Sequence, residues 1–129
     1  MTCTIGLRAV RVEDEPFLYE VYASTRTEEL AAVPWTAEEK EAFLRMQFAA
    51  QHTHYRNPTY YPNPTFLVVE LDGEPAGRLY LHRSAGEIVI VDIALLPEYR
   101  GQGVGTRLMH DLVAEADQTG ATMRLHVEP

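Results

Sequence analysis

The chain contains 129 residues, 46% of them hydrophobic and 23% charged, which is the size and composition of one globular domain with a single core. No apolar run approaches the roughly 20 residues of a membrane helix, and the N-terminus does not resemble a signal peptide, so we expect a cytoplasmic protein with no membrane partner. The excess of 19 Asp and Glu over 11 Lys and Arg opposes binding to phosphate backbones, so nucleic acid is not an expected partner.

The N-terminal part of the chain predicts one strand and then one helix. Residues 5–10 are typical of a strand, and the apolar side chains of residues 13–24 recur at helical spacing. Those side chains are Leu18, Val21 and Tyr22. Residues 25–35, which follow, are expected to form a loop.

A second helix is predicted over residues 37–51. Thr36 and Glu39 match the capping box, in which each side chain accepts a hydrogen bond from the backbone N–H of the other residue. The buried side of this helix is expected to carry Phe43, Met46 and Ala50. Three prolines then make residues 57–64 an irregular loop.

Three strands are predicted next, over residues 66–69, 76–83 and 88–95. Asp72 and Gly73 form a strong hairpin signal between the first two strands. The third strand is almost continuously apolar, which suits a central strand that is covered on both faces.

The chain is predicted to end with a helix over residues 103–118 and a strand over residues 123–127. Thr119 and Gly120 should close the helix. The predicted order is β-α-α-β-β-β-α-β, in one domain of the α/β (α+β) class spanning residues 1–129.

The turn before the last helix is rich in glycine. Gly101, Gly103 and Gly105 let the backbone approach a ligand closely, and the free N–H groups of a helix start attract anions, so a pyrophosphate fits this turn. A P-loop would need lysine after Gly105, where Thr106 stands, and the glycine spacing of a dinucleotide fingerprint is also missing. A glycine-rich turn without any ligand is the alternative.

Residues 93–109 resemble motif A of the GNAT superfamily of N-acetyltransferases, Arg/Gln-x-x-Gly-x-Gly/Ala. Arg100, Gly103 and Gly105 fill its defining positions, and residues 97–100 have the Pro-Glu-Tyr-Arg lead-in of bacterial members. The resemblance implies a mixed, mostly antiparallel sheet flanked by helices. It also implies transfer of an acetyl group from acetyl-CoA, by direct attack, to a primary amine of a small molecule or protein.

The same resemblance implies where acetyl-CoA binds. The main chain of Ile93, Ala94 and Leu95 would pair with the pantetheine arm like an added strand. The pyrophosphate would contact the backbone amides of Arg100, Gly101, Gln102, Gly103, Val104, Gly105 and Thr106.

Acetyl transfer needs a group that takes a proton from the amine, and Asp92, Glu87 and Tyr80 are the candidate catalytic residues. Asp92 interrupts an apolar strand beside the expected thioester, although a structural hydrogen bond explains it as well. Arg26 and Glu29, after the first helix, are candidates for gating the acceptor. No metal site is expected, because His52 and His54 have no cysteine or carboxylate cluster at ligand spacing.

GNAT domains continue after the fifth strand into a further helix and two strands, so the resemblance implies that a C-terminal part of the domain is missing. The strand over residues 123–127 would then leave an unpaired edge, which a second copy could cover in a homodimer. A non-catalytic acyl-CoA-binding or sensor domain is the alternative function, and a subunit fragment with a role in assembly is a third.

Overall fold

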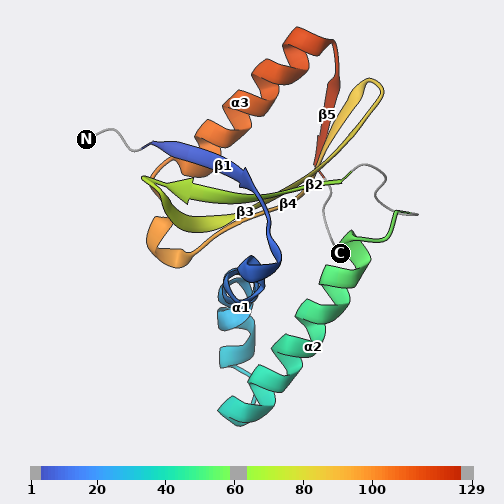
Figure 1. Ribbon diagram of the computed structural model, residues 1–129. Helices are drawn as coiled ribbons and strands as arrows, with labels where there is room; N and C mark the ends of the chain where they lie inside the picture. The colour runs from blue at the N-terminus through green and yellow to red at the C-terminus, as the bar shows by residue number, and fades with distance from the viewer. Residues whose placement is uncertain (1–3, 59–63, 126–129) are drawn as a thin grey trace.

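A computed structural model describes residues 4–58 and 64–125, which form a five-stranded sheet with helices on both faces (Figure 1). The strands lie in the order of the chain: β1 (Ile5–Ala9), β2 (Pro64–Leu71), β3 (Glu74–Ser84), β4 (Glu87–Leu95) and β5 (Thr122–Leu125). The helices are α1 (Glu15–Ala31), α2 (Ala37–Tyr55) and α3 (Val104–Thr119), and two 3-10 turns are η1 (Val12–Asp14) and η2 (Pro97–Tyr99).

The predicted element order and the mixed, mostly antiparallel sheet are both confirmed. β1 to β4 pair antiparallel in sequence, and α3 carries the chain back so that β5 runs parallel to β4. The β2–β3 hairpin turns through Asp72 and Gly73, whose φ angles of 52° and 85° are the pair of positive values that this tight turn requires. β3 is the middle strand, and β4 lies inside the sheet between β3 and β5.

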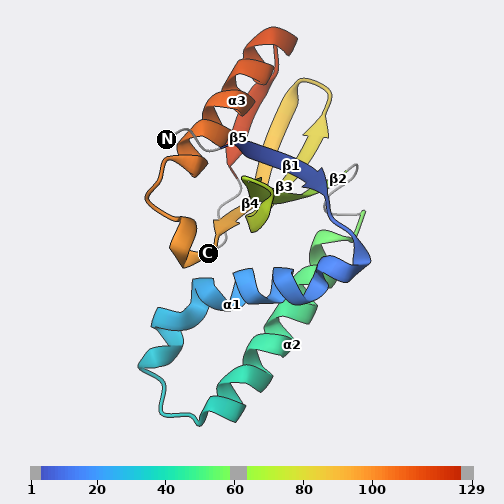
Figure 2. The ribbon, with the colours of Figure 1, turned by 60° about the vertical axis from the view of Figure 1, so that its left-hand side comes forward.

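Each face of the sheet has its own core. On one face α3 packs through Val104, Leu108 and Leu112 against apolar side chains of the strands, including Leu79 and Ile90. The opposite face is covered by α1 and α2 (Figures 1 and 2). There the apolar contacts are made by Tyr55, Tyr80, Val89 and Val91, and by Leu18, Tyr22 and Phe48.

The prediction for the first helix was too short, because α1 continues to Ala31. Its polar residues are accommodated inside the helix: the hydroxyls of Ser24 and Thr25 donate to the carbonyls of Val21 and Tyr22. The expected loop over residues 25–35 is therefore mostly helical.

The second helix begins as predicted, with Thr36 Oγ1 accepting from the Glu39 N–H and Glu39 Oε1 accepting from the Thr36 N–H. Its predicted buried side was wrong, since Met46 is 60% exposed and Ala50 is exposed. The buried residues are Phe48 and Tyr55, two turns apart on the opposite side of the helix. The N-terminal half of α2 stands away from the sheet (Figure 2), and both buried residues of the helix lie in its C-terminal half.

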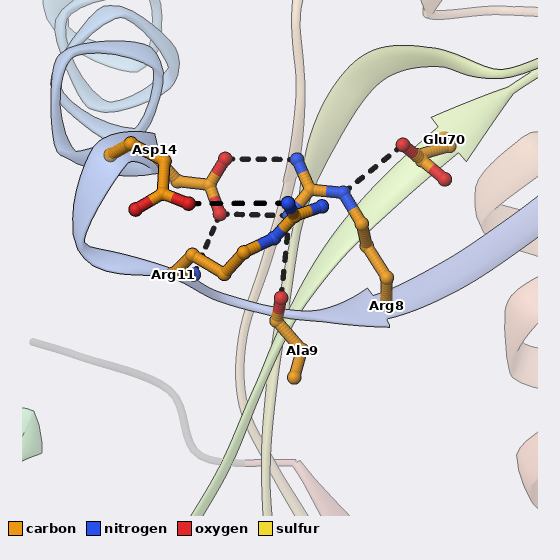
Figure 3. A network of polar contacts seen from close by, with 6 residues as sticks. Arg8, Ala9, Arg11, Asp14 and Glu70 are labelled. Carbon is orange, nitrogen blue, oxygen red and sulfur yellow. Dashed lines mark hydrogen bonds and ion pairs between the residues drawn. The ribbon is translucent and has the colours of Figure 1, made fainter.

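A network of charged side chains fixes the start of α1 (Figure 3). Arg8 of β1 donates from both Nη atoms to Asp14, at 2.8 Å each, and its Nε donates to Glu70 of β2 at 3.1 Å. Asp14 also accepts from the Arg11 N–H at 2.7 Å. The hydrogen bonds from Arg8 lower the pKa of Asp14 to about 2, against the opposing effect of burial. β1, β2 and the entry to α1 are therefore held together by one arginine.

Among the residues that the structure describes, no helix is long and apolar enough to cross a membrane.

Candidate active site

The C-terminal half of β4 separates from β5. β5 pairs only with residues 87–90 of β4, whereas β3 pairs with β4 as far as Leu95. The register between β3 and β4 shifts at Tyr80 and Leu81, which leaves Val91 as an extra residue in β4. Such a bulge bends the strand and increases its twist. Within residues 4–58 and 64–125, one edge of β4 is therefore unpaired from Val91 onward.

Backbone groups of this free edge face away from β3. The Leu96 N–H donates to the Ala76 carbonyl of β3 at 2.8 Å, and backbone groups of a strand alternate in direction. Ala94 therefore directs its N–H and C=O toward β3, while Ile93 and Leu95 direct theirs outward. Of the three residues predicted to pair with pantetheine, Ile93 and Leu95 are the ones whose main chain is placed for it.

The glycine-rich turn leads from this edge into α3. Gly101 and Gly103 have φ angles of 75° and 81°, a conformation that glycine adopts without strain. The first hydrogen bond of α3 runs from the Arg107 N–H to the Gly103 carbonyl, so the N–H groups of residues 104–106 have no acceptor within the helix. A Cβ at Gly105 would meet nothing within 4 Å, so the space beside this helix start is open. The turn has the geometry of an anion site.

The backbone amide of Arg100 was predicted to contact the pyrophosphate, but it already has a hydrogen-bond partner. That N–H donates to the Pro97 carbonyl at 3.2 Å, inside η2. Its side chain donates to the Leu95 carbonyl at 2.9 Å and to Ser24 Oγ at 3.3 Å. Arg100 thus ties the turn to β4 and α1, and the amides of residues 101–106 are the candidates for contacting an anion.

A cavity of about 420 Å³ opens on the α1 and α2 side of β4, where the strand leaves β5. α1 contributes Tyr22, Thr25 and Arg26, and α2 contributes Gln51 and Tyr55. The strands contribute Arg78, Val91, Asp92, Ile93, Ala94 and Leu125. The cavity therefore reaches the same stretch of β4 whose edge is free.

Asp92 and Arg78 form a charged pair in this cavity. Arg78 Nη2 lies 2.5 Å from Asp92 Oδ2, although the two groups are not aligned as a hydrogen bond, and the same Nη2 donates to Gln51 Oε1 at 2.9 Å. The Asp92 side chain is 24% exposed and that of Arg78 only 3%. The guanidinium also lies 5.1 Å from the centre of the Tyr80 ring. The buried cation is stabilised by one carboxylate, one amide and an aromatic face.

The structure places the three predicted catalytic residues differently. Asp92 lines the cavity. Tyr80 is its register partner on β3, but Tyr80 is only 2% exposed, and burial raises its pKa. Glu87 lies at the other end of β4, opposite Thr122, and pairs with Arg124 at 3.2 Å. Asp92 alone of the three is therefore at the cavity surface.

Arg26 and Glu29 lie in the last turns of α1, not after it, and their side chains pair at 3.3 Å. Arg26 lines the cavity, and Glu29 lines a neighbouring hollow of about 540 Å³ that Arg100 also borders. No group of three or more His, Cys, Asp or Glu side chains is placed to hold a metal ion among the described residues.

Four residues that line the cavity were not predicted as site residues: Arg78, Tyr22, Gln51 and Tyr55. The sequence does carry a signal for Arg78, because this arginine stands within the buried part of a strand, in the same alternation as Tyr80. The sequence carries no signal for Tyr22, Gln51 and Tyr55, since their distance from β4 depends on how α1 and α2 cross the sheet.

The open edge of β4, the glycine turn and the adjacent cavity define an α+β protein shaped for an extended ligand with an anionic group. Residues 17–129 match the acetyltransferase (GNAT) family, and the chain belongs to that family. The membership of the GNAT superfamily that the sequence predicted is thereby confirmed.

The chain is similar to a curated Bacillus subtilis strain 168 protein, described as a candidate ribosomal protein bS18-alanine N-acetyltransferase. The two are 32% identical over 113 residues, 88% of this chain and 62% of the relative. The chain thus spans less than two thirds of the length of this relative.

Two solved structures share the fold. The PaiA N-acetyltransferase of Thermoplasma acidophilum, in complex with coenzyme A, has a TM-score of 0.65 and 21% identity, covering 96% of this chain and 79% of its own. The ribosomal-protein-S18-alanine N-acetyltransferase of Escherichia coli has a TM-score of 0.58 and 18% identity, covering 96% and 67%.

Proposed function

We propose that the protein is an N-acetyltransferase that moves an acetyl group from acetyl-CoA directly to a primary amine. The observation that carries this proposal is the juxtaposition at β4. Its free edge leads into a glycine-rich turn that has the geometry of an anion site, and the cavity beside that edge contains a carboxylate. Family membership supports the same conclusion.

The described residues fit acetyl-CoA. The outward backbone groups of Ile93 and the Leu95 N–H would pair with the amides of the pantetheine arm. The amides of residues 101–106 would hold the pyrophosphate, helped by the positive end of the α3 dipole. When bound, acetyl-CoA supplies an acetyl carbon activated as a thioester.

The residues of the chain would then do three things. The cavity holds the acceptor amine beside β4, and Asp92 takes the proton that the nitrogen loses, directly or through a water. An outward N–H of β4 would stabilise negative charge that develops on the carbonyl oxygen. The nitrogen forms a bond to the acetyl carbon, the carbon–sulfur bond breaks, and the released thiolate of CoA takes up a proton.

The name of the Bacillus subtilis relative suggests an acceptor to try first, the amine of an alanine of ribosomal protein bS18. A small-molecule amine is the other acceptor class.

Release of CoA thiol tests the function. The purified protein should release thiol from acetyl-CoA in the presence of a suitable amine, with the acetylated amine identified by mass spectrometry. Asp92→Asn should lose most of this activity while calorimetry shows unchanged CoA binding. Tight CoA binding without thiol release, across peptides and small amines, would instead support an acyl-CoA-binding or sensor domain.

A further inference from the structure

The cavity beside β4 carries both signs of charge at its wall. Its charged residues are Arg26, Arg78 and Asp92, so cations outnumber anions among its lining side chains. Arg26 is already paired with Glu29 on α1. Arg78 and Asp92, 2.5 Å apart, form a dipolar patch with its positive and negative groups side by side.

Arg78 is also incompletely satisfied for a buried cation. Its Nε atom is buried and has no hydrogen-bond partner in the described part of the chain, and Asp92 Oδ2 has none either. A buried polar atom without a partner costs free energy, so a ligand that supplies an acceptor near the guanidinium is favoured. Arg78 is only 3% exposed and lines the cavity, so a ligand held in the cavity would lie beside the guanidinium.

A dipolar patch is complementary to a dipolar ligand. An ammonium beside a carbonyl or carboxylate oxygen matches it, because the nitrogen can face Asp92 while the oxygen faces Arg78. A polyamine brings further positive charges and no such oxygen, and it would meet two guanidiniums in a cavity of about 420 Å³.

We propose that Arg78 is a specificity-determining residue that selects acceptors whose amine lies next to a carbonyl or carboxylate oxygen, as in an amino acid derivative or a peptide N-terminus. This inference rests on the proposed function. Within it, Asp92 contacts the amine and Arg78 contacts the neighbouring oxygen.

Two amines of similar size test the proposal: alaninamide, which has the carbonyl, and 2-aminopropane, which lacks it. Rates are expressed per concentration of unprotonated amine, since the two amines titrate differently. The wild-type protein should have a kcat/KM at least about tenfold higher for alaninamide, the scale of one hydrogen bond to a charged group. Arg78→Gln should remove this preference by raising KM for alaninamide about tenfold to a hundredfold. For 2-aminopropane it should change little.

Arg83→Gln is the matched control, because Arg83 lies on the same strand but pairs with Glu115 of α3, on the other face of the sheet. It should leave the preference intact. Arg78→Lys keeps the charge and should retain part of the preference. If Arg78→Gln does not fold, the same comparison of the two amines is made with Arg78→Lys.

An equal loss for both amines in Arg78→Gln would assign Arg78 a structural role and overturn the proposal. A wild-type protein that acetylates 2-aminopropane or spermidine as well as alaninamide would overturn it too. If no amine is acetylated, the proposed function fails. Ligand-observed NMR on the CoA-loaded protein, comparing the binding of the two amines, then still decides whether Arg78 recognises the oxygen.

Discussion

Replacing Asp14 with asparagine tests whether the network around Arg8 holds the start of α1. The substitution keeps the shape of the side chain and removes the negative charge of the carboxylate, which accepts hydrogen bonds from both Nη atoms of Arg8. Arg8 would keep its hydrogen bond to Glu70 at 3.1 Å, so the guanidinium would lose one of its two carboxylate partners and retain the other. The protein should fold and be less stable at neutral pH.

The size of the effect follows from the pKa of Asp14. This pKa falls from an ordinary 3.8 to about 2 in the folded protein. At about 1.4 kcal/mol per pKa unit, the difference sets an upper limit of about 2.5 kcal/mol. The Arg8 side chain is 23% exposed, so solvent screening reduces our expectation to about 1–2 kcal/mol. Because the folded pKa is the lower one, this stability is present above pH 4 and is lost as the pH falls toward 2.

Urea denaturation of both proteins at pH 7 and pH 3 measures this contribution. The gap in unfolding free energy between wild type and Asp14→Asn should be about 1–2 kcal/mol at pH 7 and roughly half of that at pH 3. Asp111→Asn is the control, because Asp111 pairs with Arg107 on the exposed surface of α3 at 3.4 Å, and it should cost less than about 0.5 kcal/mol. A gap that does not change with pH, or one no larger than that of the control, would refute the reasoning.

Three further substitutions test the site. Gly105→Val should weaken CoA binding by about tenfold to a hundredfold in calorimetry without lowering the melting temperature, since its side chain has room in the free protein; unchanged affinity would remove this turn from the CoA site. Asp92→Asn should lower kcat by about a hundredfold or more with CoA affinity retained, and wild-type turnover would leave only a structural role for it. Gly77→Ala should cost about 1–3 kcal/mol in urea denaturation, because a Cβ there would overlap the Ala94 carbonyl oxygen. The control Gly6→Ala, whose Cβ would meet nothing closer than 3.9 Å, should cost much less, and equal costs would contradict the predicted overlap.

Local signals in the sequence predicted much of the fold. The Asp72–Gly73 hairpin, the capping box at Thr36 and the Gly120 closure of α3 each depend on residues that lie within a few positions of one another. α3 was predicted well because its apolar residues repeat every four positions and one face packs fully on the sheet.

The parts that sequence reasoning missed depend on contacts between distant segments. α1 continues past Ser24, and the hydroxyls of Ser24 and Thr25 bond back to carbonyls of the helix. From the sequence alone, this run of polar residues could not be distinguished from a loop. Arg78 meets Gln51 across 27 positions of sequence, and Asp92 lies on the next strand. Composition and periodicity say nothing about such a meeting.

The bulge at Val91 is the least predictable feature and the one on which the site depends most. In a regular strand Val91 and Asp92 would face opposite sides of the sheet. In β4 both line the cavity on the α1 and α2 side, while the preceding residue, Ile90, packs in the core beneath α3. The extra residue therefore turns the carboxylate of Asp92 to the face where α1 and α2 leave room for an acceptor. It is also the first residue of the stretch whose backbone edge is free, so the proposed acceptor and thioester sites lie at consecutive residues of one strand.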